Sequence, residues 1–160
     1  IMSELRTNRI VPRDGLVSAT GKGGGIIQVV EASTTTMVSH TSNSYIDIGL
    51  SATITPTRSD SKILIQGNIG GIETSSHNNY GQGILLRDST VILPAIDYGI
   101  GFSGDSTRAG TSSSFFILDA PASASAITYK VQFRNAANSG TITTQTNSSR
   151  SAILLMEVSG

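Results

Sequence analysis

The sequence contains no cysteine and no tryptophan, and it has few charged residues. Because cysteine is missing, disulfide bonds and thiolate sites are excluded, and the sequence points to no particular redox compartment. Only 14% of the 160 residues are charged, and 11 Lys and Arg residues balance 11 Asp and Glu residues. Nucleic acids and anionic membranes both attract an excess of positive charge. The even balance therefore argues against nucleic acid or a membrane surface as the main partner.

Long apolar runs are missing as well. No segment approaches the ~20 residues that a membrane-spanning helix needs, so we expect no membrane insertion. Small polar residues are abundant instead, with 42 Ser and Thr residues and 17 Gly residues. Disordered chains share that bias, but here Ile, Val, Leu and Phe recur in compact runs throughout. Short aliphatic runs among Ser and Thr predict an all-β protein.

Residues 126–134, AITYKVQFR, show the clearest strand pattern. Apolar and polar residues alternate from Ile127 to Phe133, so one face of this strand is expected to be buried and the other solvated. The Gly- and Ser-rich segments 74–82 and 94–114 are expected to be loops. Strand-like segments are found at residues 26–32, 45–56, 62–72, 83–93 (two short strands around a turn at Asp88 and Ser89), 115–120, 126–134, 141–146 and 151–159.

Eight to ten short strands and no convincing helix predict an antiparallel jelly-roll β-sandwich. Gly49 is expected to bend one strand, and the glycines within residues 62–72 predict a bulge or a close backbone approach. We expect the sandwich, a head domain, to span residues 25–160. Residues 1–24 are expected to form an extended arm that ends in a glycine-rich hinge, GKGGG.

The final strand carries the most information about assembly. In an antiparallel sandwich one face of each strand is normally polar, but residues 152–156 read AILLM. Four residues of this strand are expected to face the core: Ala152, Leu154, Met156 and Val158. Ile153 and Leu155 would then point outward, and an exposed aliphatic pair is unusual for a monomer. We predict that Ile153 and Leu155 lie in the interface of a closed homo-oligomer; the alternative is that a loop of the same chain covers them.

No motif predicts catalysis. GIGFSG, residues 99–104, matches the letters of a dinucleotide-binding fingerprint, but no helix is expected after it. Residues 15–22 resemble a phosphate-binding loop but have the wrong glycine spacing, and Gly23 stands where Ser or Thr is needed. His40 and His77 each lack a second ligand at metal-binding spacing. We therefore predict no catalytic residue, no cofactor and no metal site.

The polar loops carry the side chains best suited to recognition. Hydroxyls, amides, an imidazole and aromatic rings recur there, and such groups bind sugars as well as protein surfaces. The alternative is that these segments are plain solvated loops. The residues predicted to contact a host cell-surface glycan or protein are His77, Asn78, Asn79, Tyr80, Tyr98, Phe102 and Arg108.

Several segments resemble one protein family. SELRTNRIVPRDGL, residues 3–16, followed by GGGIIQVVEA, is similar to the opening of tail-fibre-like virion structural proteins of tailed bacteriophages, notably marine ones. SATITPTRSDSKILI, LLRDSTVI, ITYKVQF and SAILLMEVSG are similar to later parts of these proteins, so the resemblance covers nearly the whole chain. GKGGG departs from it, since a more varied linker is expected there. The resemblance implies a homotrimeric virion appendage with a head similar to C1q or tumour-necrosis-factor domains, its chain ends at one pole and its long loops at the other.

The arm suits a segment that becomes ordered on a partner surface, where its arginines can pair with carboxylates. We expect it to anchor the head to other virion proteins or to a neighbouring subunit. The residues expected to do so are Leu5, Arg6, Arg9, Ile10, Val11 and Arg13. The first functional hypothesis is thus a non-enzymatic tail or head fibre, exposed on the virion after assembly in the host cytoplasm. The second is a capsid decoration or collar protein without a receptor role, and the third is a surface polysaccharide depolymerase.

Overall fold

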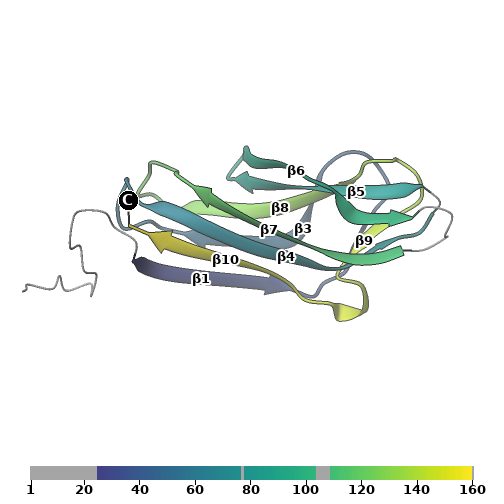
Figure 1. The fold of residues 1–160 in the computed structure, drawn as a ribbon, viewed down its shortest axis with the longest axis horizontal. Helices are drawn as coiled ribbons and strands as arrows, with labels where there is room; N and C mark the ends of the chain where they lie inside the picture. Colours follow the sequence, from purple (N-terminus) through teal and green to yellow (C-terminus); the bar gives the residue numbers. More distant parts are fainter. Residues whose placement is uncertain (1–24, 77, 104–108, 160) are drawn as a thin grey trace, which may run out of the picture.

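The computed structural model describes residues 25–76, 78–103 and 109–159, and these residues form a sandwich of two antiparallel sheets (Figure 1). A single short 3-10 helix, Thr146–Ser148, is found among them. The predicted all-β architecture is confirmed. The strands are β1 (Ile26–Thr34), β2 (Val38–His40), β3 (Ile46–Ile54), β4 (Lys62–Thr74), β5 (Asn79–Arg87), β6 (Thr90–Ser103), β7 (Ala109–Asp119), β8 (Ile127–Asn135), β9 (Ile142–Thr144) and β10 (Ser151–Val158).

The strand order is that of a jelly roll. One sheet is built on β1-β10-β4-β7, and the other has the order β3-β8-β5-β6. Since β7 pairs with β4 along nearly its whole length, β9 and β10 share the opposite edge of β4, and β2 pairs with β9. Each sheet thus combines strands from both halves of the chain, as the two Greek keys of a jelly roll require.

Alternating strands build the core between the sheets. In β3, Ile48, Leu50, Ala52 and Ile54 are buried while the residues between them are exposed. In β8 the buried residues run from Ile127 to Phe133 in the predicted alternation. The predicted irregularities are also present, because the pairing register shifts around Gly49 in β3 and before Ile72 in β4. Gly49 has a φ of +75°, which a residue with a Cβ rarely adopts.

The final strand has the opposite orientation from the one predicted. Ile153 and Leu155 have no exposed surface and belong to the hydrophobic core between the sheets. Leu154 and Met156 lie on the outer face and are partly exposed. The prediction that Ile153 and Leu155 point outward is wrong, because β10 is a central strand between β1 and β4 and both of its faces are apolar. Alternation alone could not decide which of two apolar faces turns inward.

The region predicted as a long loop, residues 94–114, is mostly strand. β6 continues to Ser103, and β7 begins at Ala109. Pairing with β5 and β4 imposes the extended conformation on residues whose Gly and Ser content favours loops. Likewise the predicted loop 74–82 ends early, because β5 begins at Asn79.

The described ends of the chain lie side by side at one pole of the sandwich (Figure 1). The backbone N–H of Ser159 donates a hydrogen bond to the carbonyl oxygen of Gly25 at 3.3 Å. The connections at residues 75–76, 78 and 136–141 lie at the opposite pole, whereas the connections at residues 55–61 and 120–126 lie at the pole of the chain ends. The arm residues predicted to anchor the head lie outside the described residues.

Candidate functional site on the outer face of the β1-β10-β4-β7 sheet

The outer face of the β1-β10-β4-β7 sheet carries apolar side chains where solvent normally meets polar ones. Strand register aligns them in rows across the sheet, since residues paired across strands point to the same side. One row is apolar across all four strands and consists of Val29, Met156, Leu64 and Leu118. Rows on either side add Ile26, Val158, Leu154 and Phe116. These eight residues are called the apolar face below.

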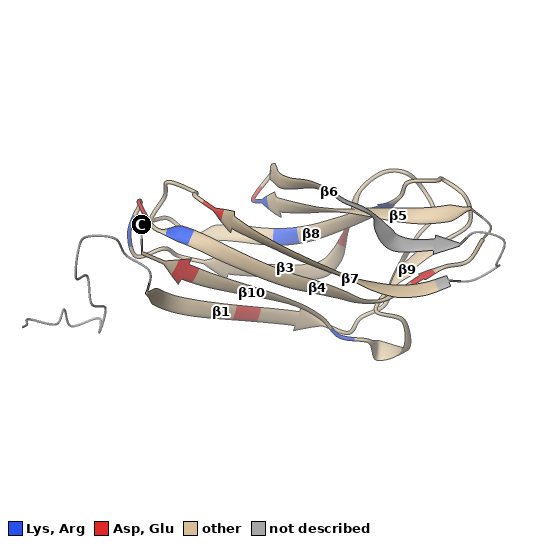
Figure 2. Cartoon of the chain, viewed as in Figure 1, with Lys and Arg blue, Asp and Glu red and all other residues tan. Residues whose placement is uncertain are grey.

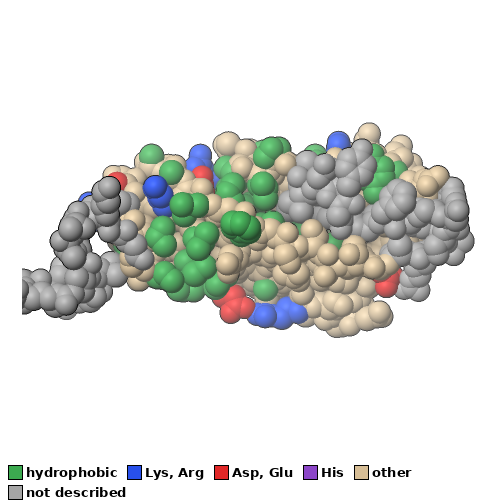
Figure 3. All heavy atoms as spheres, in the orientation of Figure 1, with side chains coloured by type: hydrophobic (Ala, Val, Ile, Leu, Met, Phe, Trp, Pro, Cys, Tyr) green, Lys and Arg blue, Asp and Glu red, His purple; other side chains and the backbone are tan. Residues whose placement is uncertain are grey.

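Four members of the apolar face are largely open to solvent. Phe116 is 77% exposed, and Ile26, Val29 and Leu118 are each more than half exposed. Figure 3 shows hydrophobic side chains gathered over the end of the sheet nearest the chain ends, whereas the described surface towards the opposite pole shows fewer of them. Single exposed apolar residues are ordinary on a protein surface, whereas a contiguous group of this kind is a candidate interaction site.

Two opposite charges lie at the margin of the apolar face, on a sheet that has few charged positions (Figure 2). Lys62 is exposed on β4 and is paired with Val158 of β10. Glu31 is exposed on β1, is paired with Leu154, and forms an ion pair with Arg150. Lys62 has no ion-pair partner among the described residues.

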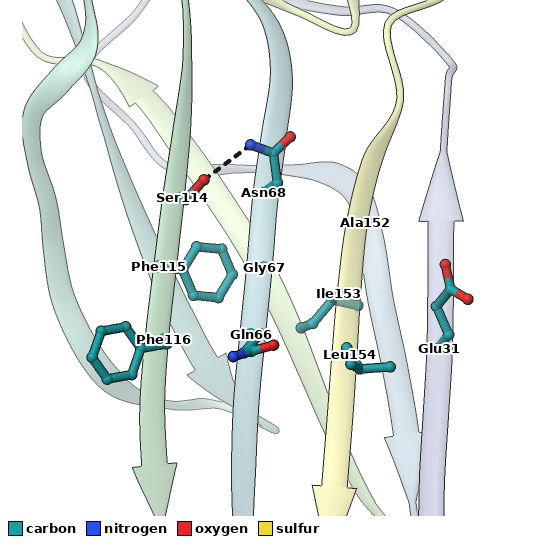
Figure 4. Close-up of a pocket in the computed structure, with 10 residues that line it drawn as sticks. All are labelled: Glu31, Gln66, Gly67, Asn68, Ser114, Phe115, Phe116, Ala152, Ile153 and Leu154. Atoms are coloured by element: carbon teal, nitrogen blue, oxygen red, sulfur yellow. Dashed lines mark hydrogen bonds between the residues drawn. The ribbon is translucent and has the colours of Figure 1, made fainter.

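A shallow groove of about 570 Å³ crosses the same face between β1 and β7 (Figure 4). Glu31, Gln66, Leu154 and Phe116 line it, and at one end Asn68 donates a hydrogen bond to the Ser114 hydroxyl at 3.1 Å. The groove therefore offers an aromatic ring and an aliphatic floor beside a few polar groups, which suits a protein surface or an apolar side chain.

Gly67 explains why one of two adjacent phenylalanines turns outward. Phe115 and Gly67 are paired, and the Phe115 ring lies over Gly67 on the inner side of the sheet (Figure 4). A Cβ on Gly67 would lie only 2.1 Å from the ring, so the missing side chain provides the space that Phe115 fills. Alternation then places Phe116 on the outer face. The signal for this face was present in the sequence, because FFIL at residues 115–118 is apolar on both faces, just as residues 152–156 are.

The residues predicted to contact a receptor differ in how exposed they are. Asn78 is exposed, whereas Asn79 is fully buried and donates a hydrogen bond to the carbonyl oxygen of Thr141 at 3.2 Å. The expectation that Asn79 contacts a receptor is therefore wrong, because its amide is used inside the fold. Tyr80 is half-buried. His77 and Arg108 lie outside the described residues. For Tyr98 and Phe102, both in β6, only the backbone is described.

Two polar clusters, one around the buried Glu157 and one around the partly buried Asp119, link strands of the sandwich near the chain ends. Glu157 on β10 accepts hydrogen bonds from the Gln28 amide, the Thr57 backbone N–H and the Thr57 hydroxyl, at 2.6, 2.8 and 2.7 Å. Burial by itself raises the pKa of the Glu157 carboxyl, but the nearby Ser61 hydroxyl and the hydrogen bonds from Gln28 and Thr57 outweigh burial and hold the pKa below its ordinary value. The carboxylate is thus a charged structural group, fully satisfied by donors.

The second cluster joins the two sheets. Asp119, at the end of β7, accepts hydrogen bonds from Arg87 of β5 at 3.0 Å and from the Tyr129 hydroxyl of β8 at 2.7 Å. Burial, the hydrogen bond to Asp119 and the charge of Asp119 raise the pKa of Tyr129 far above its ordinary value. A tyrosine held in its neutral form suits a structural tie rather than acid–base chemistry near neutral pH.

The described residues contain no group of three or more His, Asp or Glu side chains placed to hold a metal ion. His40 has a structural setting, because its Nε2 lies 2.8 Å from the Ser44 carbonyl oxygen and its ring meets the edge of Phe133. Across residues 25–76, 78–103 and 109–159 there is also no helix with the length and apolar character needed to cross a bilayer.

Comparison with solved structures identifies the fold. The crystal structure of the infectious bursal disease virus VP2 subviral particle is similar over 81% of this chain and 32% of that chain, with 14% sequence identity and a TM-score of 0.54. The structure of T=1 particles derived from infectious bursal virus matches 96% of this chain and 42% of that chain at 11% identity, with a TM-score of 0.49. The chain spans about a third of the length of the first of these. No family model and no curated protein sequence matches the chain. The first likeness shows a shared jelly-roll fold.

Proposed function

We propose that the chain is a virion structural protein. The observation that carries the proposal is a jelly roll, similar in fold to a chain of a viral particle, that exposes the apolar face instead of covering it. A protein built for repeated contacts needs such a surface, whereas a monomeric enzyme would need a pocket with convergent polar groups. The two polar clusters have structural hydrogen bonds for every charged group they contain, which supports a role without catalysis.

Within this proposal, the chain is a homotrimeric tail or head fibre. Residues 1–24 anchor it to other virion proteins, and the opposite pole faces the host. The position of Gly25 supports this division, because the described part of the chain begins at the pole away from the connections at residues 75–76, 78 and 136–141. The homotrimer no longer draws support from Ile153 and Leu155, which lie in the core.

The alternative is a capsid decoration or collar protein with no receptor role. The burial of Asn79 favours it, because fewer recognition groups then remain exposed at the pole opposite the chain ends. Binding of fluorescent full-length protein to host cells and to a glycan array distinguishes the two functions. Saturable binding that is lost on substitution of Asn78 supports the fibre, and no binding in either assay supports the decoration protein.

A deletion tests the virion assignment itself. We expect a chain that lacks residues 2–20 to fold normally and to be absent from purified particles, as measured by mass spectrometry of the particles. Unchanged incorporation of the deleted chain would contradict the anchoring role. Absence of the full-length chain from particles would contradict the virion proposal as a whole.

A further inference from the structure

The apolar face is large enough to form the centre of a protein interface. It spans four strands and three rows, and with strand and row spacings of about 4.8 and 6.8 Å its eight positions cover roughly 260 Å². This area is close to the lower end of the range for the largest apolar patch of a typical monomer, about 300–600 Å², and such patches are often functional. Towards the opposite pole, the next row is polar or small and could form the rim: Ser33, Ala152, Asn68 and Ser114.

The charges at its margin are placed symmetrically about Met156. Lys62 lies one strand away on β4 and one row nearer the chain ends. Glu31 lies one strand away on β1 and one row nearer the opposite pole. From the same spacings, each is roughly 8 Å from Met156 in opposite directions. One cation and one anion in this arrangement make the face complementary to its own copy turned by 180°.

We infer that the apolar face is a two-fold interface between two copies of this chain. The two-fold axis passes over Met156, and each Lys62 pairs with Glu31 of the other copy. The eight apolar residues of both copies are then removed from water together, which supplies the driving force, while the charge pairs fix the register. Such a contact repeats the same surface on both subunits, as two-fold interfaces do.

A second copy fits this face better than the chain's own arm. The arm segment SELRTNRIVPRDGL has three arginines against one Glu and one Asp, so its excess of positive charge favours a surface that carries several carboxylates. The described part of the apolar face offers these arginines one exposed carboxylate at its margin, Glu31, and opposes them with the cation Lys62, whereas a second copy brings one partner for each of the two charges. The inference concerns this face alone and does not depend on the virion assignment; it is compatible with trimers that use another surface.

The solution mass of the full chain gives the first test. Two copies of the 16.6 kDa chain have a mass of 33.2 kDa (2 × 16.6). We expect light scattering and sedimentation over a concentration series to show an even number of chains, two or, if trimers also form, six. A monomer at every concentration, or a trimer that does not associate further, would overturn the inference.

Charge reversal gives the sharper test. Lys62→Glu and Glu31→Lys each place like charges opposite one another at two symmetric positions, so each is expected to raise the dissociation constant at least tenfold. The double variant K62E/E31K restores opposite charges and is expected to return within about threefold of the wild type. Within one chain the two residues are roughly 17 Å apart, beyond the screening length of about 8 Å at physiological salt, so rescue reports a contact between copies.

Three controls keep the result unambiguous. Glu31→Gln breaks the ion pair with Arg150 without reversing charge and should weaken association far less than E31K. Val91→Glu adds a charge at an apolar residue, 45% exposed, on the other sheet and should leave association unchanged. Circular dichroism melts confirm that each variant is folded. Losses that simply add in the double variant, or a chain that dimerises only after residues 2–20 are removed, would show that the face is covered by something other than a second copy.

Discussion

Replacement of Glu157 by glutamine is expected to destabilise the sandwich, although the two side chains have the same shape. Thr57 directs two donors at one carboxylate oxygen of Glu157, and Gln28 directs one donor at the other. A glutamine that keeps its oxygen towards Thr57 turns its own N–H₂ towards the Gln28 amide. Gln28 cannot reverse without loss, because the same amide nitrogen donates to the Thr55 carbonyl oxygen at 2.7 Å. The donor and acceptor roles in this series of hydrogen bonds are therefore fixed.

The size of the effect follows from the bond that is lost. A hydrogen bond to a charged group contributes about 1.5–3 kcal/mol, and the bond from Gln28 is removed, so we expect E157Q to lower the free energy of unfolding by about 1.5–3 kcal/mol at pH 7. Urea denaturation followed by circular dichroism measures this difference directly. Asp60→Asn is the matched control. Asp60 also accepts hydrogen bonds from a neighbour, Arg58, and lies in the connection between β3 and β4 that contains Thr57, but its side chain is exposed to solvent. This substitution should change the midpoint little.

The pH dependence provides the refutation. Hydrogen bonds keep the pKa of Glu157 below its unfolded value of 4.5, so its contribution is complete above that pH and is lost as pH falls through the lower, folded pKa. The stability gap between the wild type and E157Q should therefore be constant from pH 7 to about 5 and shrink at more acidic pH. A gap of zero at pH 7, or a gap that persists unchanged to pH 3, would contradict the reasoning.

Two further predictions concern packing and the tie between the sheets. Gly67→Ala places a Cβ against the Phe115 ring and should lower the free energy of unfolding by about 1–3 kcal/mol in urea denaturation, whereas Gly110→Ala, where the nearest atom is 3.8 Å away, should not destabilise the chain. Tyr129→Phe removes the hydroxyl that donates to the Asp119 carboxylate and should lower the free energy of unfolding by about 1.5–3 kcal/mol at neutral pH. Because the pKa of Tyr129 is raised in the folded chain, the contribution of Tyr129 to stability is complete below its unfolded pKa of 10 and is lost as pH rises above that value. Alkaline denaturation should therefore occur at higher pH in Y129F than in the wild type. An unchanged alkaline midpoint would show that the Tyr129–Asp119 hydrogen bond does not stabilise the fold.

The sequence determined the class of fold because local signals agreed with one another. The alternation in β3 and β8 identified their buried faces, and Gly49 marked an irregularity that the register shift confirms. Such patterns are readable because side chains alternate across a strand with a period of two. Turn residues between the runs then divided the chain into strands of jelly-roll length.

Pairing partners decided what the sequence left open. β6 and the start of β7 are extended because neighbouring strands complete their backbone hydrogen bonds, not because their Gly and Ser content favours strands. Asn79 is polar and lies in a segment that reads as a loop, yet its amide serves the fold. No local pattern separates a recognition group from a structural one when both are polar.

The sequence by itself determined that this protein is an all-β sandwich and that its last strand is apolar on both faces. Only the tertiary structure decided that Ile153 and Leu155 turn inward, and that Leu154 and Met156 join Phe116 and Leu118 on the open side. The physical reason is that a strand's periodicity fixes which residues share a face, whereas the sheet that covers one face, and leaves the other exposed, is set by contacts between segments far apart in the chain.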